Sequence, residues 1–242
     1  MAFFRQFLIV TLVSLFILDS EAKIITLINK CNTTIWPGLQ VLLARQESEF
    51  MKGGFELQPE QSMNITTPPL WEFFIWARTG CSFDSSGNGG CITGDCGENV
   101  RCSLQNQFPN PPFTMVTISL GQESDVYGVY LGSGFNVPIS ISPNGPGSDK
   151  YNSSSCTSDL TKNCPEELKV TFNGQVVACT SPCLAFNTPE FCCSDSDGQN
   201  NCKATKYTKV FKDLCPAATA DNSEQNSNMC SGISQYLVSF CG

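Results

Sequence analysis

The sequence contains no histidine, and charged residues make up only 15% of its 242 residues. Without histidine, the chain cannot build a Ser-His-Asp triad or a Cys-His nucleophile. The net charge is −8 and the basic residues form no run, which argues against binding to nucleic acid or an anionic membrane. No glycine-rich phosphate loop is present, and we expect no cofactor and no bound metal.

Long apolar runs are also missing. The run from Phe7 to Leu18 is shorter than the roughly 20 residues that a membrane-spanning helix needs. It follows Arg5 and precedes Ser20-Glu21-Ala22, so residues 1–22 are typical of a secretory signal peptide. We therefore predict a mature chain of residues 23–242 that is secreted, without a transmembrane segment. No extension follows Cys241-Gly242, which favours the cell-wall space, or apoplast, over the vacuole.

Cysteine is abundant, with 15 residues, all after position 22. In an oxidising compartment this odd number allows seven disulfides and leaves one thiol. The segment Cys81–Cys102 has four cysteines among glycines and small polar residues, so burial alone cannot hold it together. Zinc is the alternative, but the gaps are wider than in zinc knuckles and histidine is absent. We favour disulfides.

Three sequons, at Asn32, Asn64 and Asn152, are predicted glycosylation sites.

Period-two alternation and β-branched residues predict many strands and few helices. We expect short strands over 36–64, broken by Pro37-Gly38 and Gly53-Gly54. Two helices are expected, one at Gln175–Phe186, where Pro182 favours a break or kink, and one at Lys206–Leu214. Strands are predicted at 23–30, 70–78, 115–120, 126–131, 137–142, 168–172 and 236–240. The acidic residues Glu190, Asp195 and Asp197 indicate a solvated loop, with weak calcium binding as the alternative.

Several motifs resemble the thaumatin-like proteins, the fifth group of plant pathogenesis-related proteins. The similarity covers essentially the whole mature chain, and Glu98 departs from it because the family signature usually has glycine there. Its carriers are Trp76-Ala-Arg-Thr-Gly-Cys81, Gly89-Gly-Cys91-Ile-Thr-Gly-Asp95-Cys96-Gly97, Gly134-Phe-Asn-Val-Pro138, Asp159-Leu160, Cys164-Pro165, Glu167-Leu168, Ala178-Cys179, Cys183-Leu-Ala-Phe-Asn187, Glu190-Phe-Cys192-Cys193 and Tyr207 to Pro216.

The resemblance implies a mainly β fold: a thaumatin-like antiparallel β-sandwich with two disulfide-rich satellite domains. The sandwich would comprise 23–78, 113–157 and 216–242, with a small disulfide loop domain at 79–112 and a disulfide-rich domain with helices at 158–215. The implied disulfides are Cys31–Cys241, Cys81–Cys91, Cys96–Cys102, Cys156–Cys215, Cys164–Cys179, Cys183–Cys192 and Cys193–Cys202. Cys230 would be left as the free thiol, because residues 150–155 contain no cysteine. It is either an inert buried thiol or a reactive one that forms an intermolecular bridge.

Family members that bind or cut β-1,3-glucan have an acidic cleft, and glycoside hydrolysis needs paired carboxylates. At the five corresponding positions this chain has uncharged residues, so the resemblance implies an emptied cleft. They are Phe74, Thr117, Gly128, Ser133 and Ala217. Asp95 remains, and we interpret it as a structural cap for local backbone amides. Phe74, Tyr127 and Tyr130 either line the cleft and stack on a ligand or belong to the core.

These observations lead to three hypotheses. The first is a secreted, monomeric thaumatin-like protein of plant defence or reproductive tissue. It is not an enzyme and binds a cell-wall polysaccharide or an extracellular protein. The second is a β-1,3-glucan-binding or weak endo-β-1,3-glucanase antifungal protein. The third is an osmotin-like ligand or inhibitor of another protein.

Overall fold

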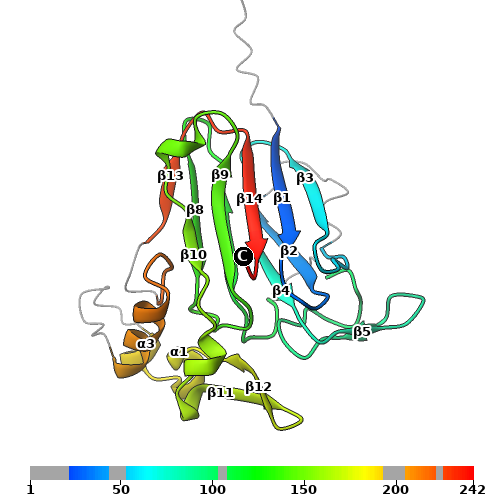
Figure 1. Ribbon diagram of the computed structural model, residues 1–242, viewed down its shortest axis with the longest axis vertical. Helices are drawn as coiled ribbons and strands as arrows, with labels where there is room; N and C mark the ends of the chain where they lie inside the picture. The colour runs from blue at the N-terminus through cyan, green and yellow to red at the C-terminus, as the bar shows by residue number, and fades with distance from the viewer. Residues whose placement is uncertain (1–21, 44–52, 103–107, 193–204, 222–225) are drawn as a thin grey trace, which may run out of the picture.

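The computed structural model describes residues 22–43, 53–102, 108–192, 205–221 and 226–242. Two five-stranded sheets stack face to face (Figure 1), and strand accounts for most of the regular structure, as predicted. The first sheet has the spatial order β10 (Ser154–Cys156), β9 (Ile139–Asn144), β14 (Gln235–Phe240), β1 (Lys23–Asn29) and β3 (Ser62–Thr67). The second has the order β13 (Asn228–Cys230), β8 (Asp125–Tyr130), β7 (Met115–Ser119), β4 (Glu72–Arg78) and β2 (Trp36–Leu43).

Side-chain alternation along the strands forms the core between the sheets. Ile25 and Leu27 of β1 are fully buried, and they face inward residues of β4 such as Phe73 and Ile75. Neighbouring strands are antiparallel except for β1 and β14, which run parallel and bring the two ends of the mature chain together. The predicted strands at both ends of the chain are therefore partners in one sheet.

Strand β2 corrects one prediction, because it runs straight through Pro37-Gly38. Proline lacks an N–H group, and β2 tolerates it since it lies at the edge of its sheet. Gly38 lies against the indole of Trp76, where an added Cβ would come within 2.3 Å of the ring. The two residues shape an edge strand instead of breaking it.

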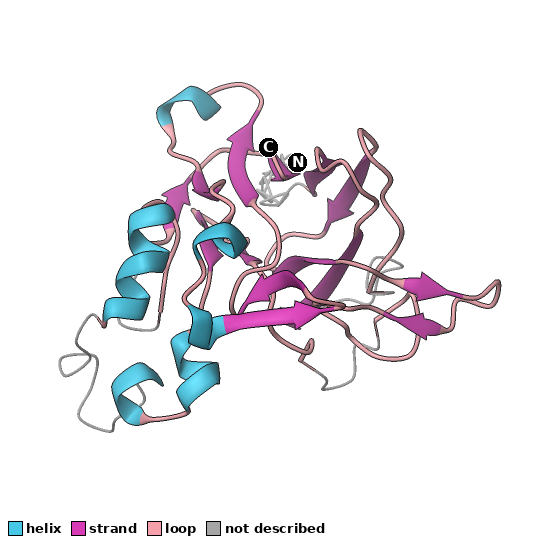
Figure 2. Cartoon of the chain, turned by 60° about the horizontal axis from the view of Figure 1, so that its bottom comes forward, coloured by secondary structure: helices cyan, strands magenta, loops and turns pink. Residues whose placement is uncertain are grey.

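Two satellites lie at opposite sides of one end of the sandwich (Figure 2). One carries the short hairpin of β5 (Ser82–Phe83) and β6 (Gly89–Gly90). The other carries most of the helices in the described residues. Its elements are η3 (Leu160–Asn163), η4 (Glu166–Leu168), β11 (Lys169–Phe172), β12 (Gln175–Cys179), α1 (Pro182–Phe186), α2 (Pro189–Cys192) and α3 (Lys206–Leu214), whereas η2 (Ser148–Lys150) follows β9. The exact division into three domains stays a prediction.

The helix predicted at Gln175–Phe186 is wrong over its first half. Asn173 and Gly174 both have positive φ, and they form the tight turn of a β11–β12 hairpin. The β-branched pair Val176-Val177 then continues as strand β12, and Pro182 begins helix α1 at a position where its missing N–H costs nothing.

Helix α3 confirms the second helix prediction with the same bounds. Thr205 and Thr208 form a reciprocal capping box at its start, and Tyr207 and Phe211 are buried.

Glu190 lies in α2, whereas Asp195 and Asp197 of the proposed calcium alternative lie outside the described residues. The described residues contain no group of three or more ligands suited to a metal ion, and no helix among them is long and apolar enough to span a membrane.

Six disulfides join described residues, and they are the pairs that the resemblance implies: Cys31–Cys241, Cys81–Cys91, Cys96–Cys102, Cys156–Cys215, Cys164–Cys179 and Cys183–Cys192. The seventh pair, Cys193–Cys202, lies outside the described residues. Cys230 is a free thiol and only 2% exposed. Burial raises its pKa above the ordinary thiol value, which keeps it protonated and poorly nucleophilic.

Cys230 lies beside a network of polar contacts that connects the two sheets. Its sulfur lies 2.9 Å from the hydroxyl of Tyr236 in β14, and that hydroxyl donates to Asp125 at the start of β8. The ammonium group of Lys23, the first residue of the predicted mature chain, pairs with the same carboxylate. The backbone N–H of Gly121 donates to its other oxygen at 3.1 Å. Asp125 thus connects strands of both sheets.

Candidate functional site

Three of the five predicted cleft positions form a row across the second sheet. Phe74 of β4 is paired with Thr117 of β7, and Thr117 is paired with Gly128 of β8. The register places these residues side by side on the face that points away from the core. Tyr130 lies two residues beyond Gly128 and therefore on the same face.

Tyr127 does not belong to this face. Its neighbours in β8 alternate outward, so its own side chain points between the sheets, where it is fully buried. Its ring packs on Tyr236 at 5.8 Å between centroids, and its hydroxyl donates to the backbone carbonyl of Asn152. Burial raises its pKa to about 12. We correct the expectation that Tyr127 lines a cleft: it is a core residue.

The two ends of the row are covered, whereas Thr117 in the middle is half-buried. Phe74 is only 2% exposed and its ring packs against Phe108 and Trp76, with centroids 5.2 and 5.5 Å apart. At Gly128, an added Cβ would already contact the backbone of Asn226 and Ser227 at 3.6 to 3.7 Å. The segment that precedes β13 therefore lies within van der Waals reach of a side chain at position 128. The floor of the expected cleft is apolar at one end and filled by backbone at the other.

The two remaining positions lie outside the strands of this sheet. Ser133 is 7% exposed, and its carbonyl accepts a hydrogen bond from the N–H of Phe113. Ala217 is exposed and lines a hollow of about 470 Å³ together with Asn152 and Asn226. This hollow is bordered by amides and hydroxyls, and it contains no carboxylate among the described residues.

The gap between the sandwich and the helical satellite is narrow. It measures about 40 Å³ and is lined by Tyr130, Phe191, Thr208 and Asp221, among others. Burial, and then the carboxylate of Asp221, raise the pKa of Tyr130. A space of this size holds a few water molecules and no sugar ring. Asp221 has no facing carboxylate among the residues that line this gap.

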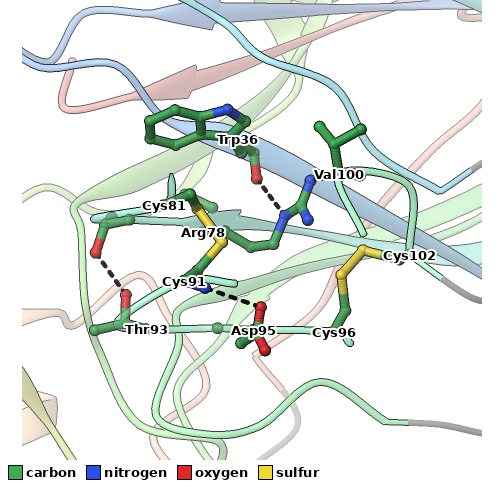
Figure 3. Close-up of a disulfide and its surroundings, with 12 residues drawn as sticks. Trp36, Arg78, Cys81, Cys91, Thr93, Asp95, Cys96, Val100 and Cys102 are labelled. Carbon is green, nitrogen blue, oxygen red and sulfur yellow. Dashed lines mark hydrogen bonds between the residues drawn. A yellow bond between two sulfur atoms is a disulfide. The ribbon is translucent and has the colours of Figure 1, made fainter. Parts of the chain in front are cut away.

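A larger hollow of about 960 Å³ lies on the small satellite. One wall is the segment from Gly89 to Arg101, and the other is Phe108 and Asn110. Two disulfides, Cys81–Cys91 and Cys96–Cys102, hold the first wall (Figure 3). The sequence motifs predicted the cross-links but not this hollow, since its second wall comes from a proline-rich stretch.

Arg78 stabilises this satellite from beneath (Figure 3). Its guanidinium is buried and donates to the backbone carbonyls of Trp36 and Val100 at 3.0 and 2.6 Å. Burial lowers its pKa to about 10, an effect that Asp95 partly offsets. Asp95 also accepts the N–H of Cys91 at 3.1 Å, which confirms its interpretation as a structural cap.

The three sequon asparagines are exposed on the surface. Asn32 follows β1, Asn64 lies in β3, and Asn152 borders the smaller hollow beside Ala217. Their exposure is compatible with glycosylation, which stays a prediction.

Two stacked five-stranded sheets, two satellites and six disulfides among the described residues define a disulfide-rich β-sandwich class of protein. The chain belongs to the thaumatin family, whose family model matches residues 29–242. It is 43% identical over 223 residues to a pathogenesis-related thaumatin-like protein 3.5 of Cryptomeria japonica, covering 91% of this chain and 90% of the relative.

Other relatives have more specific names. A protein of Prunus avium named glucan endo-1,3-beta-glucosidase is 35% identical over 227 residues, with 92% of this chain and 91% of the relative covered. Among solved structures, the thaumatin-like xylanase inhibitor TLXI is similar, with a TM-score of 0.52 and 25% identity over 90% of this chain and 99% of that chain.

Proposed function

We propose that the chain is a secreted, defence-related protein of the apoplast that acts by binding a cell-wall polysaccharide or an extracellular protein, without cutting a glycosidic bond. The observation that carries this proposal is the row of Phe74, Thr117 and Gly128. Hydrolysis needs an acid and a base or nucleophile about 5 to 10 Å apart. The row offers no ionisable group, and backbone covers its end at Gly128.

The xylanase inhibitor supports the protein-binding form of this proposal, because it is a thaumatin-like protein named for inhibiting an enzyme. A second function, endo-β-1,3-glucanase activity, is favoured by the name of the Prunus avium relative. Its carboxylates would have to come from elsewhere, and Asp95 and Glu98 both line the hollow on the small satellite. Asp95 accepts the N–H of Cys91 and raises the pKa of Arg78 by its charge, whereas Glu98 is the exposed carboxylate there.

The test is incubation of the purified, oxidised protein with laminarin, followed by measurement of reducing ends. We expect no release above that of a heat-treated sample. Release that Glu98→Gln abolishes would replace the proposal by a glucanase acting in the hollow. Release that Asp221→Asn abolishes would locate the reaction at the narrow gap instead. Either result would overturn the non-catalytic assignment.

A further inference from the structure

The hollow on the small satellite combines an exposed aromatic ring with free polar groups. The ring of Phe108 is 55% exposed, although it packs on Phe74 at 5.2 Å and on Phe113 at 5.8 Å. These tilted ring contacts hold the Phe108 side chain against Phe74 and Phe113. An aromatic side chain that is supported on one side and exposed on the other offers an apolar platform at little entropic cost.

A negatively charged, a positively charged and a neutral polar side chain line the hollow together with the ring of Phe108. Glu98 and Arg101 are exposed, and within the described part of the chain neither side chain has a hydrogen-bond or ion-pair partner. Asn110 adds an exposed amide on the wall that carries Phe108. The hollow therefore offers donors and acceptors without a strong excess of either charge, which suits a neutral hydroxyl-rich ligand better than an anion or a cation.

The two walls are held at a fixed separation. The N–H of Asn110 donates to the carbonyl of Asp95 at 2.7 Å, and Asp95 in turn accepts the N–H of Cys91. The Cys96–Cys102 disulfide closes the loop that carries Glu98. With a volume of about 960 Å³, the hollow lies at the upper end of the range of small-ligand sites. Such preorganisation reduces the entropic cost of binding.

We propose that this hollow binds a neutral oligosaccharide of the cell wall, with one sugar ring stacked on Phe108 and its hydroxyls bonded to Glu98, Arg101 and Asn110. The C–H face of a pyranose ring packs on the face of an aromatic ring, and its hydroxyls both donate and accept hydrogen bonds. This inference rests on the proposed binding function and names its ligand class and its place, which is not the covered row around Gly128.

Titration calorimetry with laminarihexaose and with xylohexaose tests the proposal on the full secreted chain. We expect binding to one of them, weakened at least about tenfold by Phe108→Ala and less strongly by Glu98→Gln. The matched control is Phe172→Ala, which removes a ring that is 47% exposed on the other satellite and should leave the affinity unchanged. Far-ultraviolet circular dichroism checks that every variant is folded, and Phe108→Tyr should restore binding if the Ala variant is impaired in folding.

The outcomes separate this inference from the proposed function. No binding of either hexasaccharide, or binding that both hollow variants leave unchanged, overturns the site; in the second case the non-catalytic binding function survives. Laminarin hydrolysis overturns the function. Inhibition of an added xylanase that Phe108→Ala removes, without any sugar binding, assigns the hollow to a protein partner and overturns the oligosaccharide assignment.

Discussion

Asp125 connects the two sheets through a buried ion pair, and its removal gives the sharpest stability prediction. In Asp125→Asn the side chain keeps its shape, and its carbonyl still accepts the N–H of Gly121. The negative charge that faces Lys23 and Tyr236 disappears. The carboxylate side chain is 1% exposed, so water cannot replace the lost interactions on that side.

The magnitude follows from two contributions. A hydrogen bond to a charged group contributes about 1.5 to 3 kcal/mol, and breaking a fully buried ion pair costs about 3 to 5 kcal/mol. The Lys23 side chain is 15% exposed and can recover part of its hydration in the variant. The free-energy cost of breaking this ion pair should therefore lie at the lower end of that range. We expect Asp125→Asn to lower the free energy of unfolding by about 3 kcal/mol. For a domain of this size that lowers Tm by about 6 to 12 °C.

The measurement is urea unfolding at pH 7 with the disulfides intact, followed by circular dichroism and by tryptophan fluorescence. Urea is preferred because it leaves ion pairs unscreened. The matched control is Glu60→Gln, which removes the carboxylate of another lysine pair. Lys30 and Glu60 are 2.7 Å apart, but their side chains are 42% and 68% exposed. That variant should lose less than about 1 kcal/mol. Equal losses in the two variants, or a loss below about 1 kcal/mol for Asp125→Asn, would refute the role of burial.

Two further predictions concern pH and reduction. The pKa of Tyr127 is about 12 in the folded protein and about 10 when unfolded, so its stabilising contribution is complete below pH 10 and is lost as pH rises through 12. Unfolding free energies measured from pH 8 to 12 should therefore fall above pH 10, and less steeply in Tyr127→Phe. Mild reduction should unfold residues 158–215 before the sandwich, because that region depends more on its disulfides than the sandwich does; limited proteolysis that cuts the sandwich first would contradict this.

Strands and helices whose conformation depends on residues close together in the sequence were predicted correctly. The alternation of Val116 and Ile118 against Thr117 and Ser119 predicted β7, and the helical spacing from Tyr207 to Leu214 predicted α3. The Asn173-Gly174 dipeptide is a strong hairpin signal that could have identified β12, and the prediction of a helix there overlooked it. The strand break predicted at Pro37 was wrong for a different reason. Proline is tolerated in β2 because β2 is an edge strand, and the order of strands in a sheet cannot be read from the local sequence.

The site was less predictable because its parts come from distant segments. The resemblance identified the five uncharged positions, but it could not show that the backbone of Asn226 and Ser227 covers Gly128. It also could not show that the side chain of Tyr127 points into the core between the sheets. The hollow likewise depends on one backbone hydrogen bond, from Asn110 to Asp95, that joins two loops without regular structure. Such contacts are set by tertiary packing, to which residue spacing gives no guide.

Phe74 links the covered row to the open hollow, because its ring packs against Phe108, which lines the hollow. Phe74 occupies the position where the resemblance places an arginine, so its presence removes a charge from the expected cleft. The same ring supports Phe108 at 5.2 Å, with Trp76 behind it at 5.5 Å. An arginine at position 74 would offer Phe108 a cation instead of an apolar surface and would need partners for its five N–H groups. The residue at the position where the resemblance places an arginine therefore provides the apolar support on which the exposed aromatic platform depends.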